Sequence, residues 1–256
     1  MKKSTNPLDY QTIPRPVAAM PKDFASGETI PPHRHRRAQV IYAATGVMRV
    51  STSAGEFVVP PLRALWMPPE IEHSLRMAGA VAMRTLYIEP RASRAMPRSC
   101  AVIEVNPLLR ALILAAMDEK LEYDRKGRGG LIMRLILAEL RAAPRLPLSI
   151  PMPRDKRLAR LCGSLLRHPD TDATLDHWAE HVGASARTLA RLFRRETGLS
   201  FGEWRAQARL VEALSLLSSG APVGHVAGKL GYRSASAFGQ MFRRALGRTP
   251  REYLVQ

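Results

Sequence analysis

The chain has 256 residues, 46% of them hydrophobic, and its 39 Lys and Arg against 22 Asp and Glu give a formal net charge of +17. That length and apolar content suffice for two domains with cores of their own, and the basicity favours a polyanionic partner, nucleic acid first. The isolated Cys100 and Cys162 exclude a disulfide framework and a cysteine metal site, and no apolar run approaches membrane-spanning length. We therefore expect a soluble, cytoplasmic protein that does not contact a membrane.

The amino-acid pattern of the first part of the chain changes near residue 23. Residues 1–22 are rich in proline and polar side chains and predict a flexible lead-in. Residues 24–89 carry short apolar or alternating runs broken by Gly and Pro, a pattern typical of a small all-β barrel or sandwich, which can hold one small ligand. The expected strands are 39–43, 47–52, 57–59, 64–67 and 81–88.

Three histidines fall within this β region. His33 and His35 are two residues apart, so in a strand both project to one face, where His73 from a later strand can join them. Three imidazoles suffice to bind a divalent metal. The full pattern is Gly27-x5-His33-x-His35-x3-Gln39-x6-Gly46, followed by Pro68-x-Glu70-x2-His73.

This pattern resembles the two motifs of the cupin superfamily, with two departures. Gln39 stands where the family has an anionic Glu ligand, and Glu70 stands where it has Gly. The resemblance implies a cupin barrel with a divalent metal (Fe, Ni or Zn) held by His33, His35 and His73; the alternative is that these histidines cap the barrel mouth or bond to backbone. A small effector is expected in a pocket lined by His33, His35, Gln39, Tyr42, Met48, Trp66, His73 and Met83.

The cupin resemblance leaves two functions open for the barrel. One is a metal-dependent cupin enzyme with an attached DNA-binding domain. The other is a sensor, favoured because the sequence offers no evident general acid or base beyond the histidines.

Two amphipathic helices are predicted after the barrel. Asn106 and Pro107 make a good helix opening, and a glycine-rich break at 127–130 separates the first helix from a second that begins near Leu131. Their wide apolar faces either complete the barrel core or bind a second copy, and we predict a homodimer here. Residues 144–154 hold four prolines and predict an extended linker.

The C-terminal part contains one short pattern twice. A small residue lets two helices cross closely, and a glycine allows the positive φ of the turn between them. Each copy therefore predicts a helix-turn-helix, with Ser185 and Ser234 capping the second helices. The corresponding residues are Ala179, Gly183 and Phe193 in the first copy and Ala227, Gly231 and Phe242 in the second.

A long helix is predicted between the copies. Residues 201–217 have apolar side chains at helical spacing, and residues 155–167 predict a shorter helix that supports the first copy. At 1.5 Å per residue the long helix spans roughly 25 Å. This length is close to the separation of about 34 Å between successive major grooves, so one chain can read two of them.

The tandem units, ending in Gly247-x-x-Pro250-x-x-Tyr253, resemble the AraC/XylS family of bacterial transcription regulators. The barrel likewise resembles the sensor half of a cupin-bearing branch of that family. The resemblance implies promoter binding, activation or repression of nearby genes, and RNA polymerase as a further partner if the protein is an activator.

The exposed faces of the two second helices predict the DNA contacts. Arginine suits guanine, alanine can sit against a thymine methyl, and glutamine suits adenine. The predicted base-reading residues are Arg187, Ala190, Arg191 and Arg194 on the first helix and Ser236, Gly239, Gln240 and Arg243 on the second. Arg195, Arg205 and Arg244 are predicted to contact phosphates. A solvated helix face is the alternative for any single arginine, but not for a matched set on two helices.

The sequence as a whole predicts an α+β protein of two domains. Residues 23–143 form an N-terminal all-β cupin-like sensor domain with dimerisation helices, and residues 155–256 form a C-terminal all-α tandem helix-turn-helix domain, joined by the linker 144–154. The expected function is a sequence-specific transcription regulator that reads two successive major grooves of double-stranded DNA and is modulated by a small effector or metal. We expect the 187–194 helix to dominate specificity.

Overall fold

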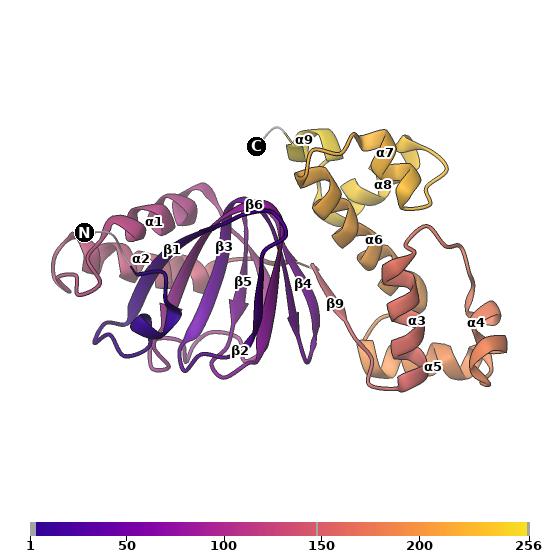
Figure 1. Cartoon of the computed structure of the whole chain (residues 1–256), viewed down its shortest axis with the longest axis horizontal. Helices are drawn as coiled ribbons and strands as arrows, with labels where there is room; N and C mark the ends of the chain where they lie inside the picture. Colours follow the sequence, from indigo (N-terminus) through magenta and orange to yellow (C-terminus); the bar gives the residue numbers. More distant parts are fainter. Residues whose placement is uncertain (1–3, 147, 255–256) are drawn as a thin grey trace. The chain divides into compact units, whose positions relative to one another are not determined.

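The computed structural model describes residues 4–146 and 148–254. The chain divides into two compact units, Met1–Ser53 with Phe57–Leu146, and Ala54–Glu56 with Pro147–Gln256 (Figure 1). We refer to the described parts of these as the barrel unit and the helical unit. In the described part of the chain no helix is both long and apolar enough to cross a membrane.

The barrel unit is an antiparallel sheet that curves into a barrel-like shape (Figure 1). Its central strands β3 and β6 are the longest, and the order of pairing is β1-β6-β3-β5-β7-β8, with β2 on β6 and β4 on β3. The predicted all-β fold of this half is confirmed. The strands are β1 Val17–Phe24, β2 Thr29–His33, β3 Ala38–Thr52, β4 Gly55–Val59, β5 Arg63–Met67, β6 His73–Ile88, β7 Ala101–Glu104 and β8 Arg145–Leu146.

Strand β3 replaces two strands that the sequence predicted separately. Gly46 lies inside it at an irregularity in its pairing with β6, and has φ +75. A Cβ at Gly46 would lie 2.3 Å from the carbonyl oxygen of Ala80, so only glycine fits there. The glycine therefore bends a continuous strand and does not end it.

The prediction of a flexible lead-in over residues 1–22 is wrong for residues 4–22, and residues 1–3 lie outside the described part of the chain. The first four residues of β1, Val17 to Met20, are all buried, and the strand pairs with β6 along its whole length. Before it, a 3-10 helix, η1 Pro7–Tyr10, buries Tyr10 completely. A run of buried residues gives no alternating pattern, which is why the composition of this segment concealed its strand.

Helices α1 Pro107–Asp118 and α2 Arg128–Ala142 pack on one face of the sheet. The side chain of Asn106 accepts a hydrogen bond from the amide of Leu109 at 2.7 Å, which confirms the predicted helix opening. Helix α2 begins before the predicted position and includes Gly130, where a Cβ would lie 2.0 Å from the carbonyl oxygen of Arg125. The predicted break between the two helices therefore ends at Gly127, the N-cap of α2, and the next two glycines lie inside the helix, where they leave room for the preceding segment.

The described residues of the proline-rich segment 144–154, which exclude residue 147, are largely extended, as predicted, but they do more than connect the two units. Leu148 and Ile150 are buried, and Ser149–Pro151 forms the short strand β9. The indole nitrogen of Trp204 donates to the carbonyl of Pro151 at 2.8 Å, and the amide of Gln207 donates to the carbonyl of Ser149. This half of the segment is therefore part of the helical unit.

The helical unit contains two helix-turn-helix motifs, which confirms the predicted all-α half. The turn glycines Gly183 and Gly231 have φ +65 and +74, and Ser185 and Ser234 cap the helices that follow, as predicted. A Ser200–Glu203 capping box starts the long connecting helix. The helices are α3 Lys156–Arg167, α4 Leu175–Val182, α5 Ala186–Thr197, α6 Phe201–Ser218, α7 Val223–Lys229, α8 Ala235–Leu246 and α9 Pro250–Leu254.

Candidate functional site

Helix α5 presents a basic face to solvent because its apolar residues are turned inward. Leu189 and Phe193 are completely buried, and the Phe193 ring meets the Trp204 ring edge to face at 6.0 Å. Three predicted base-reading residues, Arg187, Ala190 and Arg191, are consequently exposed together on the opposite side of the helix. We call α5 and α8 the reading helices.

Arg194 behaves differently from the other predicted base readers on α5. It is exposed, but its guanidinium lies 3.4 Å from both the carboxylate of Glu203 and the carbonyl of Gly198. Both partners belong to the turn and helix that follow α5. The guanidinium of Arg194 is therefore partly engaged within the protein.

The second reading helix, α8, presents fewer charges. Phe238 and Phe242 are buried, whereas Ser236, Gln240 and Arg243 are exposed. Gly239 is half-buried, and a Cβ added there would meet no atom within 4 Å. The absence of a side chain at this point lets a partner approach the helix backbone closely.

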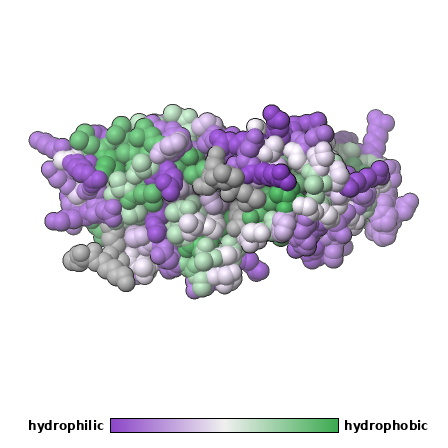
Figure 2. Space-filling view, turned by 90° about the horizontal axis from the view of Figure 1, so that it is seen from above, coloured by the Kyte–Doolittle hydropathy of each residue, from purple (hydrophilic) through white to green (hydrophobic). Residues whose placement is uncertain are grey.

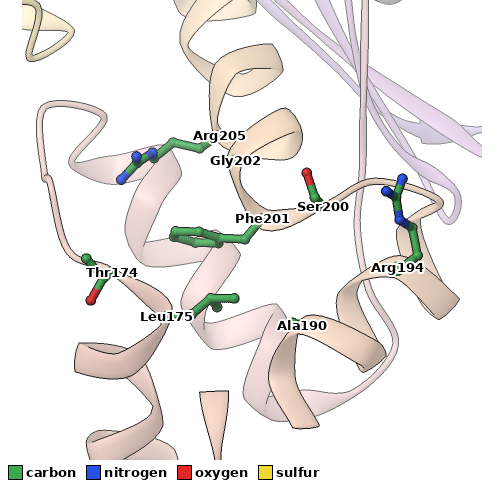
Figure 3. Close-up of a pocket in the computed structure, with 8 residues that line it drawn as sticks. All are labelled: Thr174, Leu175, Ala190, Arg194, Ser200, Phe201, Gly202 and Arg205. Atoms are coloured by element: carbon green, nitrogen blue, oxygen red, sulfur yellow. The ribbon is translucent and has the colours of Figure 1, made fainter. Parts of the chain in front are cut away.

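A pocket of about 480 Å³ lies beside the reading face of α5 (Figure 3). Arg205 stacks its guanidinium over the Phe201 ring at 5.3 Å and donates to the carbonyl of Ala173 at 3.4 Å. In Figure 3, Arg194 and Arg205 lie on opposite sides of the pocket with Phe201 between them. Two arginines on either side of an aromatic ring suit an anionic group that carries an apolar part. The lining residues are Thr174, Leu175, Ala190, Arg194, Ser200, Phe201, Gly202 and Arg205.

The other two predicted phosphate contacts are exposed at the ends of the reading helices. Arg195 is exposed and lies 3.6 Å from the partly buried carboxylate of Glu196. Arg244 lines a groove of about 430 Å³ between α6 and α8, together with Gln240 and Met241. Both arginines can therefore reach a polyanion outside the protein.

In the barrel unit the structure brings the three predicted histidines together. The ligand atoms of His33, His35 and His73 all lie within 4.8 Å of one another, and the His33 and His73 rings are 4.2 Å apart. His35 is 6% exposed and His73 only 2%. We call these three residues the barrel histidine cluster.

Hydrogen bonds orient two rings of the cluster. The Nδ1 atoms of His33 and His73 lie 2.8 and 2.9 Å from the carbonyls of Pro31 and Ile71. A carbonyl only accepts, so each Nδ1 carries the proton and each Nε2 keeps its lone pair, as metal-binding imidazoles require. The predicted alternative, in which the histidines bond to backbone, is thus observed for His33 and His73. These bonds use only the Nδ1 atoms and leave the Nε2 atoms available.

Burial favours the neutral forms of His35 and His73. It lowers the pKa of His35 to about 4, and repulsion from the protonated forms of the two neighbouring histidines lowers it further. Burial also lowers the pKa of His73 to about 4, against the opposing effect of its hydrogen bond to Ile71. Both nitrogens of His35 and the Nε2 of His73 are buried without a hydrogen-bond partner among the described residues. Neutral imidazoles with unpartnered nitrogens are the donor set that a divalent transition metal prefers.

Gln39 belongs to the wall around the cluster. Its amide nitrogen donates to Thr85 Oγ1 at 3.0 Å and lies 3.5 Å from the hydroxyl of Tyr87, whose ring meets His35 edge to face at 5.1 Å. Thr85 and Tyr87 were not among the residues predicted to line this site. The signal was the two-residue alternation of their strand, which places both on one face.

The predicted effector pocket needs a correction at two of its eight residues. Met48 pairs with Met77 and Met83 with Ala43 in the β3–β6 ladder, on the face that alternation assigns to the cluster. Tyr42 and Trp66 instead belong to the apolar core beneath α1 and α2. Tyr42 is three residues from Gln39 in the same strand, so the two side chains point to opposite faces of the sheet.

Comparison with known proteins matches both units. The family model of an AraC-like ligand binding domain covers residues 24–138, and that of a helix-turn-helix domain covers residues 178–256. The HTH-type transcriptional regulator NimR of Escherichia coli (strain K12) is 34% identical over 228 residues, which are 89% of this chain and 83% of NimR.

Two further proteins are similar to part or most of the chain. The regulatory protein SoxS of Escherichia coli (strain K12) is 33% identical over 40% of this chain and 96% of its own length. The crystal structure of ToxT from Vibrio cholerae O395 covers 94% of this chain and 97% of its own, with 11% identity and a TM-score of 0.40. By name, these two sequence relatives are a transcriptional regulator and a regulatory protein. On the two family models and the NimR match, this chain belongs to the AraC family of helix-turn-helix transcription regulators.

Proposed function

We propose that this regulator reads two successive major grooves of DNA, one with α5 and one with α8. The observation that carries the proposal is the repetition within the helical unit. Two helix-turn-helix motifs, joined by α6, each bury the apolar side of the second helix and leave its other side free. Such helices enter a major groove with their exposed side chains against base edges.

The two reading faces differ in chemistry, and so do the bases that suit them. On α5, Arg187 and Arg191 suit bidentate contact with guanine, and Ala190 suits a thymine methyl. On α8, Gln240 suits adenine, with Ser236, Gly239 and Arg243 beside it. The larger number of exposed arginines on α5 supports a dominant role for the first motif in specificity.

The pocket in Figure 3 supports a phosphate role for its two arginines. Arg205 is held in place by Phe201 and by the carbonyl of Ala173, so it loses little conformational freedom on meeting an anion. We assign Arg194 to the same role, with Arg195 and Arg244 at the helix ends. These contacts fix the register of the protein on DNA without carrying sequence information.

The experiment that tests the DNA proposal is selection of bound DNA fragments followed by quantitative footprinting. Arg191→Ala and Gln240→Ala should each weaken binding by about 1–3 kcal/mol and relax preference at one base pair, in different halves of the site. Arg160→Ala is the matched control for charge, because Arg160 is exposed on α3. Wild-type footprints for both reading variants at equal salt would refute the reader assignment.

For the barrel unit we propose that the histidine cluster is the effector site. A divalent metal bound by His33, His35 and His73 would act as a Lewis acid that anchors an anionic or polar effector. The chain itself contributes the three imidazoles, the backbone bonds that orient two of them, and the Gln39–Thr85–Tyr87 wall. Equilibrium dialysis against Fe²⁺, Ni²⁺ and Zn²⁺ tests this: His73→Ala should lower the bound ions by one per chain, and an unchanged number would refute the metal assignment.

We propose that the protein is a homodimer, with a second copy covering α1 and α2. Leu108, Leu131 and Leu135 are about half exposed on these helices, at 51%, 52% and 48%. Hydrophobic residues gather on the barrel-unit end of the face in Figure 2. Exposed apolar groups of this kind are typical of association surfaces. Contact with RNA polymerase follows only if the protein activates transcription.

A further inference from the structure

The outer face of α4 carries a second group of metal-ligating side chains, separate from the barrel. His177, Glu180 and His181 are all exposed, and their ligand atoms lie within 4.8 Å of one another. The two imidazole rings are 4.6 Å apart, because residues four apart in a helix lie one turn above each other.

The geometry of this group suits one divalent transition metal. The Nδ1 of His181 lies 2.8 Å from the carbonyl of His177, so it carries the proton and leaves the Nε2 lone pair free. Ligands about 2.1 Å from a tetrahedral ion are roughly 3.4 Å apart, a distance that exposed side chains reach by rotation alone. Glu180 adds a carboxylate, and the open positions remain for water.

Helix α4 is also weakly secured by its own packing. It has 8 residues, none of them buried, whereas α5 buries Leu189, Leu192 and Phe193. A helix this short is marginal without tertiary support. Yet α4 is the helix against which the first reading helix packs.

We propose that His177, Glu180 and His181 bind one Zn²⁺-type ion that staples the last turns of α4 and so stabilises the first helix-turn-helix motif. The two histidines are adjacent only when α4 is helical, so the ion binds the folded helix and not its opened form. Binding then adds to the stability of α4 through linkage. At a free ion concentration ten times the dissociation constant, local opening of α4 falls about tenfold.

The first test counts ions bound by the full chain. Equilibrium dialysis against Zn²⁺ should find one ion per chain fewer in the double variant His177→Ala with His181→Ala than in wild type. His225→Ala is the matched control, because His225 is exposed on α7 and outside the group, and it should bind as wild type does. The double variant His33→Ala with His73→Ala should keep the α4 ion whatever the barrel binds, which separates this proposal from the barrel metal.

The second test measures how much the bound ion stabilises α4. Hydrogen exchange of the α4 amides should slow about tenfold in wild type when Zn²⁺ is raised to ten times its dissociation constant, and should not change in the α4 double variant. Alanine is a better helix former than histidine, so that variant should fold and its metal-free exchange should be no faster than wild type. Equal ion counts in the α4 variant and wild type, or α4 exchange insensitive to Zn²⁺ in wild type, would overturn the proposal. Neither test uses DNA, so failure of the DNA-reading proposal would not affect them.

Discussion

At the scale of single residues, Glu70 is held in a backbone conformation that suits glycine. Its φ is +62, and its amide donates to the carbonyl of His35 at 2.8 Å, next to the barrel histidine cluster. A left-handed conformation costs a non-glycine residue about 1–2 kcal/mol. Its ion pair with Arg34, at 3.8 Å between exposed groups, offsets little of that cost.

We therefore expect Glu70→Gly to leave the free energy of unfolding unchanged or raise it by up to about 1 kcal/mol, since strain relief offsets the extra freedom of the unfolded glycine. Glu72→Gly is the control, because Glu72 is exposed and is not among the described residues with positive φ. It should lose about 0.5–1 kcal/mol. Urea unfolding of both variants measures the difference, and equal losses would contradict the strain argument.

Arg205 gives a second prediction at this scale. If it meets a phosphate, Arg205→Ala should weaken specific and non-specific DNA binding equally and reduce the slope of log K against log salt by about 0.9. Arg205→Lys should restore the slope but only part of the affinity, because lysine keeps the charge and loses the planar group that stacks on Phe201. An unchanged slope for Arg205→Ala, measured by fluorescence anisotropy, would exclude the phosphate role.

How far the sequence predicts single residues depends on whether they act locally. The caps Ser185, Ser234 and Asn106 and the turn glycines were predictable, because a cap or a turn is decided within a few residues. Tyr42 and Trp66 were predicted to face the histidine cluster, but the alternation of side chains along β3 and β5 places them on the opposite face of the sheet. The pairing register of these two strands shows this. The pairing of Arg194 with Glu203 could not be read from the sequence, since it depends on how α6 leaves the turn.

At the scale of elements, α3 is a helix that is stabilised by the residue capping its N-terminus. Asp155 accepts hydrogen bonds from the amides of Arg157 and Leu158, and its carboxylate also binds the Arg157 guanidinium at 2.8 Å. These bonds, led by that of the Arg157 side chain, lower the pKa of Asp155 to about 2. Its folded pKa lies below its unfolded value, so its stabilisation is present above pH 4 and is lost as the pH falls toward 2.

We expect Asp155→Ala to lower the free energy of unfolding by about 1 kcal/mol at pH 7, because α3 loses its cap. Asp155→Asn should keep most of that stability, because an amide oxygen caps as well as a carboxylate does. Thermal unfolding at pH 7 distinguishes the two variants. Equal destabilisation would mean that the Arg157 ion pair, and not the cap, stabilises the helix.

The β elements were harder to predict than the helices. Caps and a local period predict helices such as α3, α5 and α6. Strand β1 instead pairs with β6, with partners from Phe24 and Val81, 57 residues apart, to Val17 and Ile88, 71 residues apart. Strand β2 contains Pro31 and Pro32, which argue against a strand by composition, yet it pairs with β6 at Ile30 and His33 around them. Which strands pair depends on residues far apart in the chain, and the local pattern of a single sequence does not identify these partners.

At the scale of the whole molecule, the proposed dimer predicts a change of mass. Leu131→Arg should convert a dimer into a monomer in sedimentation at micromolar concentration, because it places a charge in the middle of the proposed interface. Leu8→Arg is the control, since Leu8 is 70% exposed and lies in η1, outside the helix pair. A wild-type monomer, or a dimer that survives Leu131→Arg, would refute the interface.

The bonds from α6 to Ser149 and Pro151 determine where the helical unit can be cut from the chain. A fragment starting at residue 155, where composition alone would divide the protein, leaves the indole of Trp204 without its acceptor and removes Ile150 and Pro153, which are buried in the intact chain. A fragment starting at residue 148 retains them. We expect the longer fragment to unfold cooperatively at a higher temperature by calorimetry, because a donor such as the Trp204 indole costs about 1–3 kcal/mol when it stays buried without an acceptor. We therefore expect the shortest fragment that folds and binds DNA by itself to include strand β9, although the prolines around this strand are typical of a linker.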